Sequence, residues 1–113
     1  MNMVTLEVAS REKSDRRFLS ALRGKPQGAF ISFESPALLF KVFSGKRWDL
    51  LKTMAGAGPV TIREAARRTA RDVKAVHGDI QSILKAGILE KTDEGKVVFP
   101  FNAIHVDFML NVA

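Results

Sequence analysis

The chain has 113 residues, of which 46% are hydrophobic and 27% are charged, so it can bury the core of one domain and is too apolar for an intrinsically disordered protein. Lysine and arginine outnumber aspartate and glutamate by 18 to 12, and the formal net charge of +6 favours an anionic partner such as a nucleic acid. The chain contains no cysteine, which excludes disulfides, thiolate metal sites and cysteine nucleophiles.

The sequence also bears on the cellular compartment. Its first ten residues lack the basic segment and apolar run of a secretory signal peptide. No apolar stretch reaches the roughly 20 residues that a membrane-spanning helix needs. We therefore expect a soluble, cytoplasmic protein that has no membrane partner.

The first third of the chain predicts a strand, a helix and a second strand. Residues 4–8 alternate apolar and polar side chains, which is the period of a strand. Residues 11–24 place apolar side chains at helical spacing and end in a glycine, a common helix stop. Residues 29–33 (AFISF) have the composition of a second strand. We expect residues 1–34 to form an N-terminal strand–helix–strand unit that contributes to dimerisation.

Two helices are predicted next. Ser35 is a favoured N-cap, and Pro36 suits the first position of a helix. A further helix follows the Ser44–Gly45 break and ends at a cluster of glycines and proline near residue 58. The shared apolar face of that helix consists of Trp48, Leu51, Met54 and Ala55.

Residues 61–86 predict a short helix, a turn and a longer helix. Thr61 and Glu64 form the T-x-x-E pattern of a capping box, in which the hydroxyl caps the helix and the glutamate bonds back to the cap amide. The longer helix is capped by Asp72 and ends near Ala86. Its predicted apolar stripe is Val73, Val76, Ile80, Ile83 and Leu84. Its opposite face is Lys74, Ala75, Gly78, Gln81, Ser82 and Lys85.

The last part of the chain predicts strands. Residues 88–100 contain two short strands separated by the turn sequence Asp93–Glu94–Gly95. Residues 104–112 alternate apolar and polar side chains in the cleanest strand pattern of the chain. Because an unpaired strand is an exposed edge, we expect the first and last strands to pair, within one chain or across two. An open edge that receives a strand from another protein is the alternative.

The order of elements from residue 46 to residue 100 is that of a winged helix-turn-helix: helix, capped short helix, turn, longer helix, hairpin. Residues 46–108 resemble the MarR-like winged helix-turn-helix regulators of bacteria and archaea. Within them the chain is most similar to a group of small prokaryotic DNA-binding and antitoxin proteins. The segments that carry the resemblance are RWDLL, RDVKAVHGD, LKAGILEKTDEGKVVF and AIHVDF.

The resemblance implies sequence-specific binding of double-stranded DNA by a homodimer that represses a nearby promoter. The alternative that it implies is an antitoxin, which neutralises a toxin protein by binding it and represses its own operon. The predicted fold class is α+β, with a winged helix-turn-helix at residues 35–100 and a C-terminal strand at residues 101–113 for pairing or dimerisation.

The chain departs from the family at four positions. The family often has Leu-Gly in the turn, where this chain has Thr69–Ala70; a positive φ at Ala70 would cost about 1 kcal/mol relative to glycine, and a turn of a different type is the alternative. A polar residue and an arginine are common where this chain has Ala75 and Gly78. Gly78 either permits close approach of the helix to DNA or to a partner, or marks the loss of a contact at a tolerant surface position.

The predicted DNA contacts fall into two groups. Phosphate contacts are expected from basic side chains around the two helices and from the N-terminus of the first, with a solvated charged surface as the alternative. Base or phosphate contacts are expected from the outward face of the longer helix. The full predicted set is Arg47, Thr61, Arg63, Arg67, Arg68, Arg71, Lys74, Gln81, Ser82 and Lys96.

No catalytic site is predicted. His77 and His105 lie 28 residues apart without cysteines or spaced carboxylates, so they do not make a metal site. The chain has no pattern of a nucleophile with its base and no phosphate-binding glycine loop. We therefore expect a protein that is not an enzyme and has no cofactor.

Overall fold

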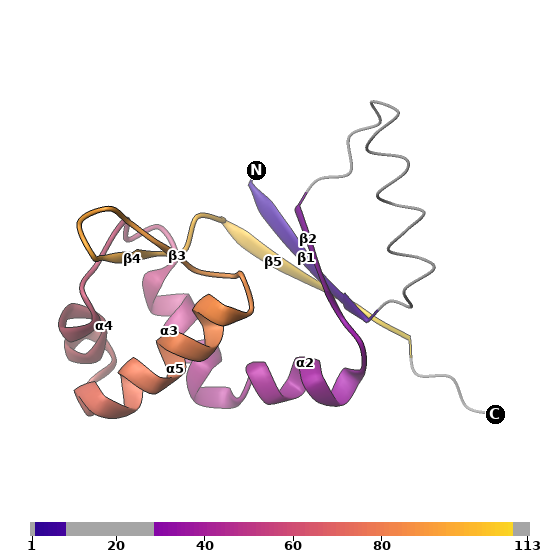
Figure 1. Cartoon of the computed structure of the whole chain (residues 1–113), viewed down its shortest axis with the longest axis horizontal. Helices are drawn as coiled ribbons and strands as arrows, with labels where there is room; N and C mark the ends of the chain where they lie inside the picture. Colours follow the sequence, from indigo (N-terminus) through magenta and orange to yellow (C-terminus); the bar gives the residue numbers. More distant parts are fainter. Residues whose placement is uncertain (1, 9–28, 110–113) are drawn as a thin grey trace.

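The computed structural model describes residues 2–8 and 29–109, and within them the fold is α+β. In Figure 1 the helices between residues 45 and 85 and a small hairpin lie on one side of the molecule, and a sheet with the helix at residues 36–42 lies on the other. The helix predicted over residues 11–24 and the last residues of the predicted C-terminal strand lie outside the described residues.

The three-stranded sheet brings together segments from both ends of the chain. Its strands are β1 (Met3–Val8), β2 (Ala29–Phe33) and β5 (Ala103–Asp107), in the order β2-β1-β5. Both pairs are parallel, and Leu6 of β1 lies opposite Ile31 and Val106. The predicted pairing of the first and last strands is therefore confirmed, and it occurs within one chain.

Four helices are described, and their starts follow from local sequence. The Ser35 hydroxyl accepts a hydrogen bond from the Leu38 amide at 3.3 Å, and the Asp72 carboxylate accepts one from the Ala75 amide at 3.2 Å. Both predicted N-caps are confirmed. The helices are α2 (Pro36–Val42), α3 (Gly45–Met54), α4 (Ile62–Thr69) and α5 (Val73–Lys85).

The predicted capping box of α4 forms in part. The Thr61 hydroxyl accepts a hydrogen bond from the Glu64 amide at 3.1 Å, as expected. The Glu64 carboxylate, however, accepts hydrogen bonds from Arg67 and Arg68, and the prediction that it would bond back to the cap amide is wrong. Guanidinium groups one turn further along the helix offer charge-assisted bonds, which are stronger than a bond to a neutral amide.

A single buried core joins the helices to the sheet. Val76, Ile80 and Ile83 of α5 are fully buried and belong to the same cluster as Leu6 of β1 and Leu50 of α3. Two members of the predicted α5 stripe differ from expectation. Leu84 is half-buried, and Val73 is 44% exposed because it is the first residue of the helix, at the edge of the core.

The hairpin consists of β3 (Glu90–Lys91) and β4 (Val97–Val98), which pair antiparallel. It is anchored to the helices by Val60, in the loop before α4. The amide of Val60 donates to the carbonyl of Val97 at 2.8 Å, and the Val97 amide donates back at 2.8 Å. The bridge fixes the hairpin beside the N-terminus of α4.

Candidate functional site

The centre of the candidate site is the turn between α4 and α5. Ala70 ends α4 in the left-handed conformation, with a φ of 53°, so of the two alternatives left open by the sequence the turn adopts the one with a positive φ at this alanine. The Arg71 amide then donates to the Ala66 carbonyl at 3.0 Å, which closes the end of α4. The turn directs α5 across α4 after only three residues.

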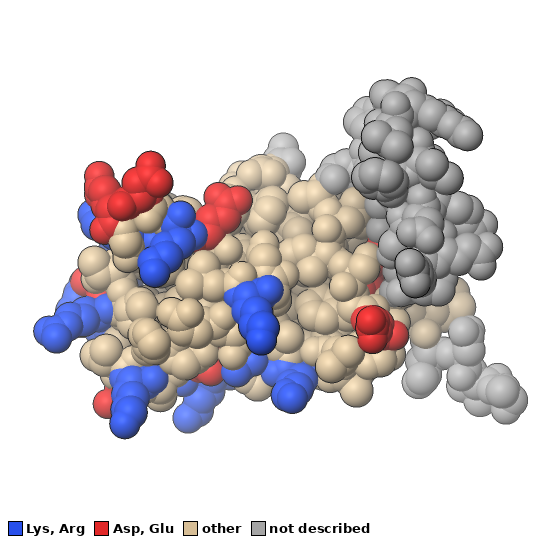
Figure 2. Space-filling view, in the orientation of Figure 1, with Lys and Arg blue, Asp and Glu red and all other residues tan. Residues whose placement is uncertain are grey.

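Exposed basic side chains project from both helices. Arg63 and Arg67 are exposed on α4, and Lys74 and Lys85 are exposed on α5. Figure 2 shows lysines and arginines along the lower left of the molecule, where Figure 1 places α4 and α5. Carboxylates gather instead on the β3–β4 hairpin, where Asp93 and Glu94 are exposed. The two helices therefore present positive charge on a different part of the surface from the acidic hairpin tip.

Two of the arginines on α4 are held by a carboxylate. Glu64 accepts hydrogen bonds from Arg67 Nε at 3.0 Å and Nη2 at 2.5 Å, and from Arg68 Nε at 2.8 Å. The hydrogen bond from Arg67, which has the larger effect, and the hydrogen bond from Arg68 lower the pKa of Glu64 to about 2. Because one carboxylate faces two guanidinium groups, the cluster keeps a net positive charge and its arginines are oriented.

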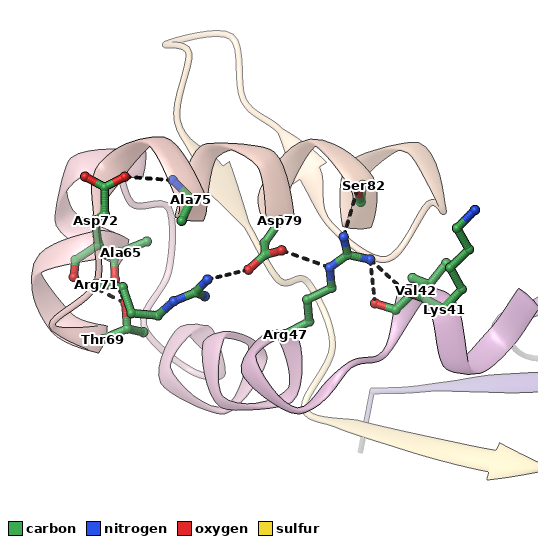
Figure 3. A network of polar contacts seen from close by, with 11 residues as sticks. Lys41, Val42, Arg47, Ala65, Thr69, Arg71, Asp72, Ala75, Asp79 and Ser82 are labelled. Carbon is green, nitrogen blue, oxygen red and sulfur yellow. Dashed lines mark hydrogen bonds and ion pairs between the residues drawn. The ribbon is translucent and has the colours of Figure 1, made fainter.

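A second carboxylate joins three parts of the fold (Figure 3). Asp79 on α5 accepts hydrogen bonds from Arg47 Nε at 3.0 Å and from Arg71 Nη2 at 2.7 Å. All three side chains are less than a fifth exposed. Burial raises the pKa of Asp79, but the hydrogen bonds from Arg71 and Arg47 outweigh burial and hold it below its usual value. We call these three residues the Asp79 cluster.

Arg47 also connects α2 to α5. Its Nη1 donates to the carbonyls of Lys41 and Val42 at 3.0 and 3.1 Å, at the end of α2. Its Nη2 donates to the Ser82 hydroxyl at 3.3 Å. Carbonyls at a helix end lack partners within the helix, so Arg47 satisfies two of them while it positions α5.

The ten predicted contact residues therefore occupy three kinds of position. Arg47, Arg71 and Ser82 make internal hydrogen bonds in or beside the Asp79 cluster. Lys96 is half-buried in the hairpin, with its Nζ 3.8 Å from a Glu94 carboxylate oxygen. The exposed members on α4 and α5 are Thr61, Arg63, Arg67, Arg68, Lys74 and Gln81.

The role of Asp79 was not predicted from the sequence. Asp79 lies three residues before Ser82 in the sequence. Helical spacing places it at the border of the apolar stripe of α5. Two arginines, Arg47 and Arg71, lie in neighbouring elements that pack on this side. An aspartate at the border of a stripe, with basic residues in adjoining elements, is the sequence feature that could have indicated a structural ion pair.

Gly78 lies on the exposed side of α5, beside Lys74 and Ala75. A Cβ atom built at Gly78 has no described atom within 4 Å. Packing among the described residues therefore does not require a glycine here. Both explanations of Gly78, close approach to a bound molecule and loss of a contact, concern the outer surface of the helix.

In residues 2–8 and 29–109, no three histidine, aspartate or glutamate side chains are grouped so that they could hold a metal ion. Of the helices in the same ranges, none has both the length and the apolar character needed to span a bilayer. A small cavity of about 180 Å³ lies beside β5, lined by Trp48, Lys52 and Ile104 among others.

Comparison with known proteins identifies one family. The family model HVO_A0114 matches residues 42–106, which is more than half of the chain. The match runs from the end of α2 through α3, α4, α5 and the hairpin into β5. No curated protein and no solved structure matches the chain. All ten predicted contact residues lie inside the matched range.

Proposed function

The chain belongs to the HVO_A0114 family, and we propose that it binds double-stranded DNA as a dimeric transcriptional repressor. In this proposal α3, α4 and α5 with the β3–β4 hairpin act as a winged helix-turn-helix, in line with the resemblance to MarR-like regulators. Helix α4 crosses the DNA backbone and α5 enters the major groove. The dimer, bound at a promoter, blocks transcription.

The observation that carries the proposal is the outward surface of α5. Lys74 and Gln81 are exposed on it. Ala75 has only a small side chain and Gly78 has none, so nothing at these two positions projects beyond Lys74 and Gln81. A lysine can donate to the acceptors of guanine, and a glutamine can pair with adenine through two hydrogen bonds. These are the side chains to which we assign base readout.

Phosphate contacts in the proposal come mainly from α4. Arg63 is exposed, and Arg67 and Arg68 are oriented by Glu64. Contacts to phosphates position a protein on the duplex and make binding depend on salt. The Thr61 end of α4 adds backbone amides that favour an anion.

The internal residues have a different part in the proposal. Arg47 and Arg71 hold Asp79, and Ser82 accepts a hydrogen bond from Arg47, so these side chains position α5 instead of meeting the DNA. Lys96 lies close to Glu94 at the acidic hairpin tip, which reduces its attraction for phosphate. We expect the hairpin to contribute little to affinity.

A dimer would present two α5 helices to successive turns of the major groove, about 34 Å apart. The terminal sheet offers the edges at which a second copy could pair. Strand β1 is flanked on both sides, whereas β2 and β5 are the outer strands of the described sheet. This arrangement supports dimerisation through the terminal segments.

The test is a gel shift with the DNA upstream of the gene and with a scrambled duplex of equal length. We expect preferential binding to the upstream DNA, and weaker binding when salt rises from about 50 to about 200 mM. Lys74→Ala and Gln81→Ala should each reduce the preference by about 1–3 kcal/mol, because each removes a base contact.

Lys52→Ala is the matched control. It removes the same charge from an exposed position on α3, beside the cavity next to β5. It should leave the preference unchanged. Equal, weak binding to both duplexes, unaffected by Lys74→Ala, would contradict the proposal. Arg71→Ala is unsuitable because it would also break the Asp79 cluster.

A further inference from the structure

An open groove lies between α2, the end of β2 and the C-terminal turn of α5, with a volume of about 360 Å³. Such a volume is at the lower end of the range of binding clefts. Phe33, Leu38 and Val42 give the groove an apolar lining. Its charged lining residues, among those that the structure describes, are all basic, namely Lys41, Arg47 and Lys85.

Helix α2 carries more exposed apolar surface than its size requires. Among its seven residues only Lys41 is charged, and only Leu39 is buried in the core. Leu38, which lines the groove, is 45% exposed, and Phe40 is 55% exposed. Phe40 lies two positions from Leu38, on another side of the helix, and its ring contacts that of Phe108 with centroids 5.5 Å apart, so Leu38 is the more exposed apolar side chain that faces the groove. An apolar lining bordered by charges is typical of a surface that another molecule covers.

The charges of the groove restrict what can cover it. Arg47 is fixed in the wall by its bonds to Asp79, Ser82 and the end of α2. Lys41 and Lys85 are exposed, at the last turns of their helices. Both lysines line the groove, so a molecule that buries the apolar lining contacts them, and it gains most if it brings carboxylates there.

We propose that this groove binds an acidic amphipathic helix of a partner protein. The helix inserts apolar side chains between α2 and α5 and places carboxylates beside Lys41 and Lys85. Apolar residues at positions i, i+3 or i+4 and i+7 are the usual anchors of a helix in a groove. DNA fits less well because its backbone would leave Phe33 and Leu38 in water. The proposal does not depend on the proposed binding of DNA.

The experiment selects ligands without assuming their sequence. A displayed library of randomised helical peptides is selected on the full-length protein, and the enriched peptides are synthesised and measured by fluorescence anisotropy. We expect apolar residues at helical spacing flanked by aspartate or glutamate. The Lys41→Glu/Lys85→Glu variant should bind these peptides at least about tenfold more weakly. Peptides with lysine in place of the acidic residues should bind this variant with restored affinity.

Further variants separate the apolar surface from the charges. Leu38→Ser should also weaken the peptides at least about tenfold, because it removes an exposed apolar contact. Lys46→Glu/Lys52→Glu is the matched control, since it reverses two charges on α3 that do not line the groove, and it should have no effect. Circular dichroism and thermal melting check that each variant is folded.

Several results would overturn the proposal. These are a library that yields no binder, enriched peptides without acidic residues, and binding that Lys41→Glu/Lys85→Glu leaves unchanged. If Leu38→Ser turns a dimer into a monomer in sedimentation equilibrium, the groove belongs to a second copy of the chain. If Leu38→Ser abolishes DNA binding, the groove belongs to the DNA interface.

Discussion

At the scale of single residues, two positions in or near the α4–α5 turn hold residues that do not favour stability. Ala70 adopts a left-handed conformation that glycine tolerates better, and Gly78 occupies a helical position that alanine tolerates better. Neither residue is in the buried core. The chain therefore has a non-optimal residue for stability on each side of the turn, and both can be tested without disturbing the core.

Ala70→Gly should stabilise the fold. A left-handed alanine costs about 1 kcal/mol that glycine does not, although the greater freedom of glycine in the unfolded chain offsets part of this gain. We expect an increase of about 0.5 kcal/mol in the free energy of unfolding, measured with urea. Thr69→Gly, at the last residue of α4, is the control and should destabilise, because it places glycine at a helical position and removes the hydrogen bonds of the Thr69 hydroxyl to the Ala65 and Ala66 carbonyls. A loss of stability in Ala70→Gly would contradict the assigned φ.

Gly78→Ala should stabilise α5 by about 1 kcal/mol, because a Cβ atom there meets no described atom and alanine favours the helix. Urea unfolding checks this value. The gel shift of the same variant then decides between the two explanations of the glycine. Unchanged DNA binding means that a contact has been lost at a tolerant position. Weakened binding by a more stable protein means that the DNA approaches the backbone of α5.

At the scale of the elements, the orientation of α5 depends on a polar contact in addition to apolar packing. The Asp79 cluster joins α5 to the first turn of α3 and to the α4–α5 turn, which contains Arg71. Arg47 extends this connection to the end of α2. Because the cluster is mostly buried, removing its carboxylate leaves two guanidinium groups without their partner.

Asp79→Asn should lower the free energy of unfolding by about 2 kcal/mol, since it replaces charge-assisted bonds by neutral ones at a mostly buried position. Asp49→Asn, at an exposed position of α3, is the control and should stay within about 0.5 kcal/mol of the wild type. Chemical denaturation at pH 7 gives both values. Equal stability of the two variants would show that the Asp79 cluster does not hold α5.

The cluster also predicts a pH dependence. The folded pKa of Asp79 lies below its unfolded value of about 3.9, so its contribution is complete above that pH and is lost as pH falls through the folded pKa. Wild-type protein should therefore lose more stability below about pH 4 than Asp79→Asn does. Denaturation curves collected from pH 7 downward compare the two. Parallel loss in both proteins would contradict the assigned ionisation.

At the scale of the whole molecule, the features that could be predicted from the sequence are those that depend on residues close together in the chain. Capping side chains marked the starts of α2, α4 and α5, and alternation marked β1 and β5. Apart from the pairing of β1 with β5, the sequence did not predict contacts between elements distant in the chain. The bridge from Val60 to Val97 involves one residue on each side and has no period, and the arginines that meet Asp79 come from separate elements.

The positions of the candidate site residues could be predicted only in part, for the same reason. Helical spacing placed Lys74 and Gln81 correctly on the exposed side of α5, because that side is defined by the helix itself. It placed Ser82 on the same side, where the Arg47 side chain from α3 reaches it. A helical projection cannot show which outward positions a neighbouring element covers.

The parallel pairing of β1 with β5 has a consequence for synthesis of the protein. The ribosome makes β1 first, yet the Asn2 side chain and the Pro100 carbonyl that meet at one end of the sheet are separated by 98 positions. At a translation rate of about 5–20 residues per second, β1 waits on the order of 5–20 seconds for that partner. During this interval α2 to α5 have emerged while the sheet is still incomplete. One edge of β1 therefore stays open until β5 has been made, whereas in the folded protein β1 is flanked on both sides.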